Sequence, residues 1–406
     1  MAEGSTWEPI LDGADADAAW QAIRDIARAI GEGHGTRRRP ADLALFWAYV
    51  AGALDDDWTT ARYEEAVEHL CSWISEGAGG PRLFGGLASA GWVLSHISDD
   101  GDEALGQIDA VMLAAAEAPT RLYDLISGLV GDGVYFLERL ASGDAPVAQR
   151  GLATVIDRLI AASQPTAMGL AWLTPNAALP PLQRPHAPDG YFNCGLAHGA
   201  PGPIALFGRA ASREPRAEAA CKDALRWLAA QQQPPDPQGR FPAWVLPDGT
   251  ASRSRTAWCY GDPGVAIAAW SASVRLGLPT ESWRALARET ATREPEQCGV
   301  VDAGMCHGAA GLGHLYNRYF QASRDPVFRD AARAWFQRAL AMRRPDGLGG
   351  FAAWSLGGEG SAWAPAADLV EGASGVALAL LAAVHPSEPN WDRLFLCDLP
   401  PMEAGG

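Results

Sequence analysis

The chain has 406 residues, with 32 lysines and arginines against 48 aspartates and glutamates, and therefore a formal net charge of −16. This acidity argues against a protein that binds nucleic acid or an anionic membrane, because phosphates are bound by clustered basic side chains. Hydrophobic residues make up 48% of the chain, enough for a sizeable core, which excludes an intrinsically disordered protein.

Helical periodicity dominates the chain. Apolar residues recur at three- and four-residue spacing with charges on the opposite face, which predicts amphipathic helices. In chain order these helices cover residues 16–30, 60–74, 217–230 and 327–342. Alternating β-branched residues are almost absent, so the sequence predicts an all-α fold. Two proline-rich stretches, 177–188 and 234–250, interrupt the helices, and we expect loops there that shape access to a site.

A second set of predicted helices is apolar nearly all round. Each follows a Gly-x-x-Gly or Gly-x-x-Ser motif, and the motifs begin at Gly86, Gly128, Gly199, Gly261, Gly308 and Gly372. A degenerate seventh copy begins near Arg39. Such a recurrence is an internal repeat that pairs one buried helix with one amphipathic helix. Seven pairs closed into a ring predict an α/α toroid of about seven inner and seven outer helices, and an open superhelix is the alternative.

Potential metal ligands precede two of the anchoring glycines. Copy four reads Cys259-Tyr260-Gly261 and copy five reads Cys306-His307-Gly308, so two cysteines hold equivalent positions of consecutive repeats. In a ring, equivalent positions of adjacent units are neighbours. Two thiols and one imidazole are ligands that zinc prefers, and three protein ligands leave the open fourth position of a catalytic site. The alternative is that both cysteines are small buried hydrophobic residues.

Four motifs resemble those of the lanthionine synthetase C-like (LanC) cyclases. Residues 258–264 (WCYGDPG), 306–311 (CHGAAG) and 195–202 (GLAHGAPG) are similar to three signature motifs, and residues 123–131 (YDLISGLVG) are similar to the aspartate-bearing second repeat. The resemblance extends from about Arg39 to the tail at Trp391. It implies a single α/α-toroid domain over residues 1–406, with an outer-helix segment at 1–35 and the repeats at 36–395.

The resemblance implies an enzyme, a zinc-dependent lanthionine synthetase of a lanthipeptide (lantibiotic) pathway. Such a cyclase adds peptide cysteine thiols to dehydroalanine or dehydrobutyrine and thereby forms lanthionine or methyllanthionine thioether rings. It implies one Zn²⁺ per chain, held by Cys259, Cys306 and His307. The expected partners are a dehydrated precursor peptide and a separate dehydratase, with a transporter as a further candidate in a biosynthetic complex.

Three more residues match the family's catalytic positions, and a fourth candidate, Tyr260, stands beside a candidate metal ligand. His198 is the candidate proton donor, since imidazole titrates near neutral pH. Asp124 would orient His198 or take up the thiol proton, and its alternative role is a helix N-cap. Arg255 would steady an enolate, with Arg253 as its competitor. Tyr260 would donate a hydrogen bond to the same oxygen, or simply pack.

Two other functions remain open. One is a non-cyclising relative that binds zinc, a peptide or glutathione as a scaffold or chaperone, although the presence of His198, Asp124 and Arg255 argues against it. The other is a toroidal terpene cyclase with magnesium at the acidic runs 55–57 and 99–103, which solvated turns explain more simply. Cys194, four residues before His198, is expected in the core rather than at the metal.

The compartment follows from three further features of the sequence. Seven cysteines, odd in number and widely spaced, favour reduced thiols over a disulfide framework. The N-terminus lacks the basic and apolar segments of a secretory signal. The longest strongly apolar stretch, 375–384, is shorter than the roughly 20 residues that cross a bilayer. We therefore expect a cytoplasmic protein that is not transmembrane.

Overall fold

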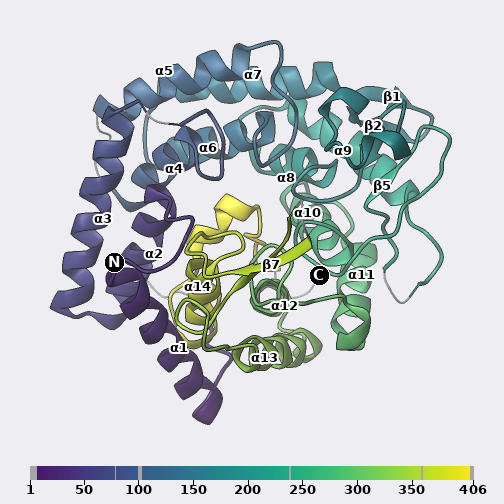
Figure 1. The fold of residues 1–406 in the computed structure, drawn as a ribbon. Helices are drawn as coiled ribbons and strands as arrows, with labels where there is room; N and C mark the ends of the chain where they lie inside the picture. The colour runs from purple at the N-terminus through teal and green to yellow at the C-terminus, as the bar shows by residue number, and fades with distance from the viewer. Residues whose placement is uncertain (1–6, 78, 99–102, 237–238, 358–359, 403–406) are drawn as a thin grey trace. The chain divides into compact units, whose positions relative to one another are not determined.

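The computed structural model describes residues 7–77, 79–98, 103–236, 239–357 and 360–402, and these residues form fourteen α-helices (Figure 1). The predicted all-α character is confirmed. The four predicted amphipathic helices are α1 (Gly13–Gly31), α3 (Asp57–Ser75), α9 (Arg216–Ala230) and α13 (Pro326–Ala341). The chain divides into two compact units: unit 1 comprises residues 1–79, 300–392 and 401–406, and unit 2 comprises residues 80–299 and 393–400.

Unit 2 contains copies one to four of the repeat. Its buried helices are α4 (Leu87–Ile97), α6 (Leu129–Ala141), α8 (Pro201–Ala210) and α10 (Asp262–Arg275). Each contacts the next along this series, α4 with α6, α6 with α8 and α8 with α10. The outer helices that cover them are α5 (Glu103–Glu117), α7 (Pro146–Ala162), α9 and α11 (Glu281–Ala291).

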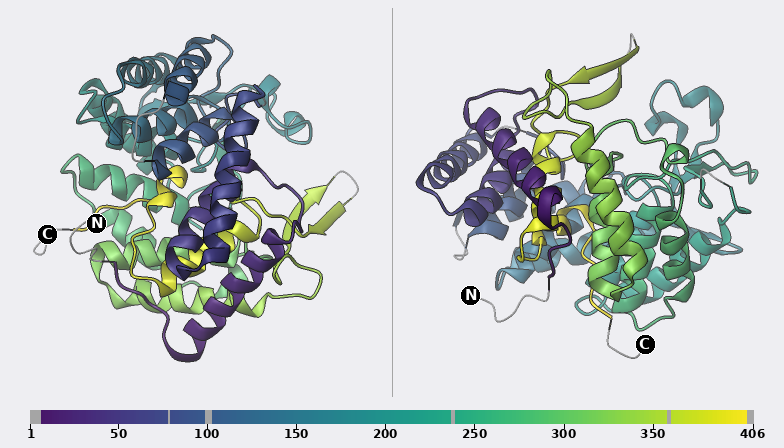
Figure 2. Two further views of the ribbon diagram at one scale, coloured as in Figure 1. Left: turned by 90° about the vertical axis from the view of Figure 1, so that its left-hand side faces the viewer. Right: turned by 90° about the horizontal axis from the view of Figure 1, so that it is seen from below.

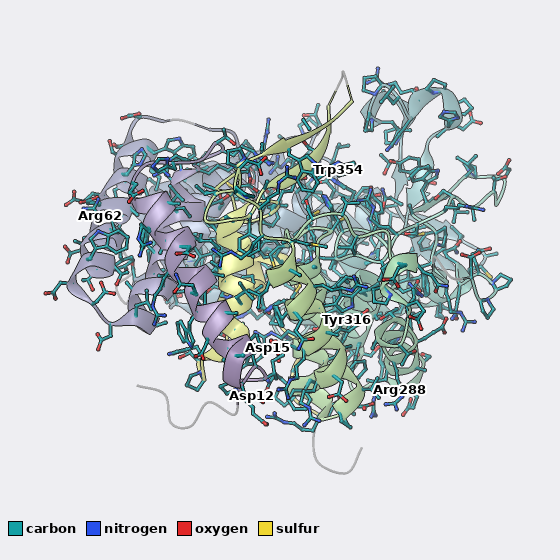
Figure 3. The ribbon with its side chains drawn as sticks, turned by 60° about the horizontal axis from the view of Figure 1, so that its bottom comes forward. Asp12, Asp15, Arg62, Arg288, Tyr316 and Trp354 are labelled. Carbon is teal, nitrogen blue, oxygen red and sulfur yellow. The ribbon has the colours of Figure 1, made fainter. Side chains whose placement is uncertain are left out.

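Unit 1 contains copies five and six and the degenerate copy. Its inner helices are α12 (Ala309–Ser323), α14 (Ala373–Val384) and α2 (Pro40–Leu54), and its outer helices are α13, α1 and α3. Helix α14 contacts both α12 and α2, so the last repeat packs against the first helix pair of the chain, as the ring predicts (Figure 1). Asp12 and Asp15 near the start of α1 receive hydrogen bonds from Arg333 and Gln337 of α13, at 2.6 and 2.7 Å (Figure 3).

The inner helices are largely buried, which explains why their sequences are apolar nearly all round. Residues 373–383 of α14 are all buried, as are residues 309–322 of α12. Two polar side chains of α12 have a partner inside the unit, since Asp392 accepts hydrogen bonds from His314 Nε2 at 2.7 Å and Arg318 Nε at 2.6 Å. No helix in the described part of the chain is long and apolar enough to cross a membrane.

Short strands were not predicted from the sequence. They form the hairpin β1–β2, the three-stranded sheet β3–β4–β5 and the hairpin β6–β7, which projects from the helices of unit 1 in Figure 2. Because the strands have only two to five residues, they are too short to produce a clear alternation of apolar and polar residues. Their bounds are β1 (Gln164–Thr166), β2 (Gly169–Ala171), β3 (Leu173–Thr174), β4 (Tyr191–Asn193), β5 (Trp244–Val245), β6 (Ala353–Gly357) and β7 (Gly360–Ala364). The 3₁₀ helices are η1 (Asn176–Ala178), η2 (Arg184–His186), η3 (Pro295–Gln297) and η4 (Asn390–Phe395).

One of the two acidic runs forms the junction between helices α2 and α3. Asp55 has a left-handed conformation with φ of 50° after the end of α2. Asp56 is the N-cap of α3, because its side chain accepts a hydrogen bond from the Thr59 N–H at 2.9 Å. This run is therefore a helix–helix turn, as the simpler explanation predicts. The acidic residues 99–102 lie outside the described residues.

Asp42, near the start of α2, is a buried carboxyl group that makes stability depend on pH. Its Oδ2 accepts a hydrogen bond from the Leu369 N–H at 3.1 Å. Burial raises the pKa of Asp42 to about 7, Arg39 opposes the rise and Asp368 adds to it. The stability that protonated Asp42 contributes is therefore complete below its unfolded pKa of 3.8 and is lost as pH rises through about 7.

We expect the Asp42→Asn variant, which stays neutral, to gain stability relative to the wild type as pH rises from 5 to 8. One proton limits this gain to about 1.4 kcal/mol per pH unit. Urea unfolding of both proteins at several pH values measures the difference in free energy of unfolding. A difference that is constant across this range would contradict the assignment.

Candidate metal and catalytic site

The loop before an inner helix has the same backbone construction in most copies. The N–H after the anchoring glycine donates to the carbonyl oxygen six residues before that glycine, as in Leu87 to Gly80 at 2.9 Å and Ala309 to Asp302 at 2.9 Å. In these loops the backbone passes so close to itself that a side chain at the anchoring position would not fit, which requires glycine. At Gly261, where φ is +99°, an added Cβ would lie 1.6 Å from the Arg255 carbonyl oxygen. The repeated glycines therefore serve the construction of the loops.

Consecutive loops are hydrogen-bonded to one another two or three residues before their anchoring glycines. In unit 2, the Leu125 N–H donates to Ala197 O at 3.1 Å, and the Ala197 N–H donates to Cys259 O at 3.4 Å. In unit 1, the Cys306 N–H donates to Val370 O at 2.8 Å. The expectation that equivalent positions of adjacent repeats are neighbours is thus confirmed within each unit.

His198 and Asp124 meet between copies two and three, in unit 2. His198 Nδ1 lies 3.4 Å from Asp124 Oδ2, and the side chains are 43% and 15% exposed, respectively. Asp124 Oδ1 also accepts a hydrogen bond from the Ser127 N–H at 2.8 Å, so Asp124 both shapes its turn and contacts the histidine. Burial opposes the ionisation of Asp124, but His198 and the Ser127 N–H outweigh it and lower its pKa. Asp124 is therefore a carboxylate at neutral pH.

Tyr260 lies beside His198, with the two ring centroids 6.2 Å apart. Its hydroxyl oxygen accepts a hydrogen bond from Asn193 Nδ2 at 3.1 Å. Asn193 is buried, and its Oδ1 accepts a hydrogen bond from the Gly195 N–H at 2.9 Å. The sequence analysis missed Asn193. The sequence feature that could have indicated Asn193 is its position six residues before an anchoring glycine. Arg255 and Asp302 hold the same position in copies four and five.

Cys259 and Arg255 differ in their exposure. The Cys259 side chain is buried, next to Trp258, whose indole N–H donates to Phe395 O at 2.9 Å. The side chain of Arg255 is exposed, and so is that of its competitor Arg253. Exposure therefore does not separate the two arginines.

Cys306 and His307 lie in unit 1 and are partly buried. His307 Nε2 is 3.8 Å from Oδ2 of Asp302, a buried carboxyl group on the same loop. Burial raises the pKa of Asp302, while His307 and the N–H groups of Trp354 and Gly304 oppose the rise. The sequence analysis did not single out Asp302.

Cys194 belongs to the core, as expected. It is fully buried, and burial raises the pKa of its thiol, which keeps it protonated and unsuited to binding a metal. Of the three candidate metal ligands, Cys259 lies in unit 2, and Cys306 and His307 lie in unit 1.

The comparison with protein families assigns the chain. The model of the family described as lanthionine synthetase C-like protein matches residues 41–396, most of the chain. The chain belongs to the lanthionine synthetase C-like family. This confirms the resemblance that the motifs around Gly199, Gly261 and Gly308 indicate.

Solved structures provide a second comparison for this lanthionine synthetase C-like chain. The structure of nisin cyclase matches with a TM-score of 0.72 and 17% sequence identity, over 92% of this chain and 96% of that chain. The match confirms the predicted α/α-toroid fold class. A cellobiose 2-epimerase from Spirochaeta thermophila matches with a TM-score of 0.47 and 13% identity, over 74% of this chain and 84% of that one, too weakly to support an argument. No curated protein matches the chain.

Proposed function

We propose that this chain is a zinc-dependent lanthipeptide cyclase. It would add cysteine thiols of a dehydrated peptide to dehydroalanine or dehydrobutyrine and form lanthionine or methyllanthionine rings. The observation that carries the proposal is the row of loops before the inner helices. Residues before the anchoring glycines of this family member include two cysteines, two histidines and a tyrosine, and the His198–Asp124 pair lies in the same row.

The repeat supports a metal site of Cys259, Cys306 and His307. Within each unit, consecutive loops are hydrogen-bonded at equivalent positions, as Ala197 is to Cys259 and Cys306 is to Val370. Copies four and five are consecutive, so the same relation would bring Cys259 beside Cys306. Two thiols and one imidazole fit Zn²⁺ and leave its fourth position to a substrate thiol. When bound, zinc supplies the Lewis acidity that lowers the pKa of a coordinated thiol.

His198 would supply the proton that completes the addition. The new C–S bond forms at Cβ of the dehydro residue while the electron pair of the C=C bond moves to Cα and the adjacent carbonyl. His198 is exposed enough to reach a peptide and can deliver a proton to Cα, and the proton released by the substrate thiol balances the reaction. With Nδ1 held by Asp124, Nε2 is the nitrogen that faces the substrate.

Arg255 and Tyr260 would stabilise the developing negative charge on the carbonyl oxygen. The Tyr260 hydroxyl is held in place by Asn193 and lies next to His198. The exposed Arg255 offers a guanidinium that a bound peptide can reach.

The proposed partners are a dehydrated precursor peptide, the separate dehydratase that makes it, and a transporter. The seven cysteines are odd in number and widely spaced, which suits the reducing cytoplasm that we propose as the compartment. The presence of the His198–Asp124 contact disfavours the alternative, a scaffold that binds zinc, a peptide or glutathione without cyclising, because a scaffold has no need of a proton donor.

The proposal is tested with purified protein and a dehydrated precursor peptide. We expect about one zinc per chain by elemental analysis, and loss of peptide thiols that a thiol-alkylating reagent reveals as a smaller mass increase. Addition of a thiol across C=C leaves the peptide mass unchanged, so alkylation is the readout. A peptide without dehydro residues, and the dehydrated peptide without protein, are the controls. Zinc binding with no thiol loss beyond the controls would support the scaffold.

A further inference from the structure

The carboxyl group of Asp302 is held by two backbone N–H groups. Oδ1 accepts a hydrogen bond from Gly304 N–H at 3.2 Å, and Oδ2 accepts one from Trp354 N–H at 3.0 Å. The side chain is 1% exposed. Two donors from separate segments, the loop of copy five and strand β6, fix the direction of both oxygens.

Neighbouring atoms leave this carboxyl group little freedom to move. A Cβ added to Gly308 would lie 2.5 Å from Asp302 Oδ1. On its other side Asp302 bonds Trp354, which Figure 3 shows on β6, where the hairpin joins the helices of unit 1. A carboxylate fixed in this way can hold a neighbouring side chain in one orientation.

His307 is that neighbour. Its Nε2 lies 3.8 Å from Asp302 Oδ2, an ion-pair distance that is longer than a hydrogen bond, and its side chain is 11% exposed. A negative oxygen on this side of the ring favours a proton on Nε2. A neutral imidazole protonated at Nε2 keeps its lone pair on Nδ1, and that nitrogen is then the one available to a metal.

A related arrangement occurs in copy three, where the contact is to the next copy rather than to the same one. Asn193 also stands six residues before an anchoring glycine, and its Oδ1 accepts the N–H of the residue two positions later. Its Nδ2 holds Tyr260, the residue directly before the anchoring glycine of the next copy. In both units, therefore, a buried side chain at this place contacts a side chain directly before a glycine.

We propose that Asp302 is a positioning residue for the metal ligand His307. It holds the imidazole from its Nε2 side and directs Nδ1 to the metal. The inference rests on the proposed zinc site of Cys259, Cys306 and His307. Carboxylates that bind the second ring nitrogen of a metal-bound histidine fix its orientation, and losing one typically weakens metal affinity about 10- to 100-fold.

The first experiment compares zinc affinity between Asp302→Asn and a matched control. Asp109→Asn also neutralises a buried carboxyl group, which lies on the outer helix α5 of unit 2 and accepts hydrogen bonds from Tyr135 and Arg139 of the inner helix α6. Zinc dissociation constants are measured by competition with a chromophoric chelator, and melting temperatures show how far each variant is destabilised. We expect Asp302→Asn to weaken zinc binding about 10- to 100-fold, and Asp109→Asn to leave it unchanged at a comparable melting temperature.

The second experiment observes the protonation of the two His307 ring nitrogens directly, in the wild-type protein. ¹⁵N-labelled histidine in the zinc-loaded chain, with His307 assigned by its absence from His307→Ala spectra, distinguishes a metal-bound Nδ1 from a metal-bound Nε2. We expect a protonated Nε2 and a metal-bound Nδ1. Nε2 bound to zinc, or equal zinc affinity in Asp302→Asn and wild type, would overturn the positioning role.

The outcomes separate this inference from the proposed function. If wild-type protein binds no zinc, or binds it equally well without Cys306, the proposed zinc site is wrong and the role of Asp302 falls with it. If wild-type protein binds zinc through the three ligands while the Asp302→Asn variant binds it as tightly, only the positioning role is wrong.

Discussion

Replacing Cys306 by alanine is expected to remove the bound zinc and to slow ring formation by at least about a thousandfold, equivalent to about 4 kcal/mol of activation free energy. One imidazole and one thiol are too few protein ligands for a stable zinc site of this kind. Without the metal, the substrate thiol keeps its ordinary pKa and remains largely protonated at neutral pH. Elemental analysis and the thiol-alkylation assay measure the two losses.

Cys221→Ala is the matched control. Cys221 is a buried cysteine in unit 2 whose thiol donates to the Ile204 carbonyl oxygen at 3.4 Å. We expect this variant to keep its zinc and its cyclisation rate, with at most a small loss of stability. If Cys306→Ala retained both zinc and ring formation, or if both variants lost zinc alike, the ligand assignment would be wrong.

His198→Ala is expected to keep one zinc per chain and to lose about 10²- to 10⁴-fold in the rate of ring formation. Zinc is retained because His198 is not in the donor set, and the rate falls because general acid catalysis contributes an effect of this size. Metal analysis and single-turnover rates with a dehydrated peptide measure the two quantities. His69→Ala, which removes an exposed histidine from α3, is the control and should change neither.

The role of Asp124 is tested on the same assay. In Asp124→Asn the carboxylate beside His198 Nδ1 is gone, so the imidazole is held less well and the rate of ring formation should fall, by less than in His198→Ala. If Asp124 acts through His198, adding Asp124→Asn to the His198→Ala variant should cause no further loss of rate. A further loss in the double variant would instead assign Asp124 a purely structural role in its turn, where it accepts the Ser127 N–H.

The sequence predicts the helices because their patterns are long. Helix α3 (Asp57–Ser75) extends over several turns with one apolar face, and α14 (Ala373–Val384) is apolar throughout. The anchoring glycines also predict where inner helices begin, since Gly261 and Gly308 are the N-caps of α10 and α12. A strand such as β5 (Trp244–Val245) has two residues and no pattern to detect.

The same distinction holds for the candidate site, where some residues belong to a repeated sequence motif and others are recognised only by their contacts in the fold. Cys259, Cys306, His307 and His198 could be proposed from the sequence because they lie in register with repeated glycines. Asn193 and Asp302 could not be singled out, because their contacts are with distant residues. Asn193 bonds Tyr260, 67 positions away, and Asp302 bonds Trp354, 52 positions away. Only the folded chain brings these pairs together.

In the loops before the inner helices, the residues that fix the backbone are different from the residues that could carry chemistry. The glycine and the backbone hydrogen bonds fix each loop, while the residue directly before the glycine varies freely between copies, as Ser127, His198, Tyr260, His307 and Glu371 demonstrate. Each repeat thus offers one interchangeable position on a constant backbone. Single substitutions there can add, remove or replace a functional group while the scaffold stays intact, which gives both evolution and protein engineering a row of independent sites at which to build new activities.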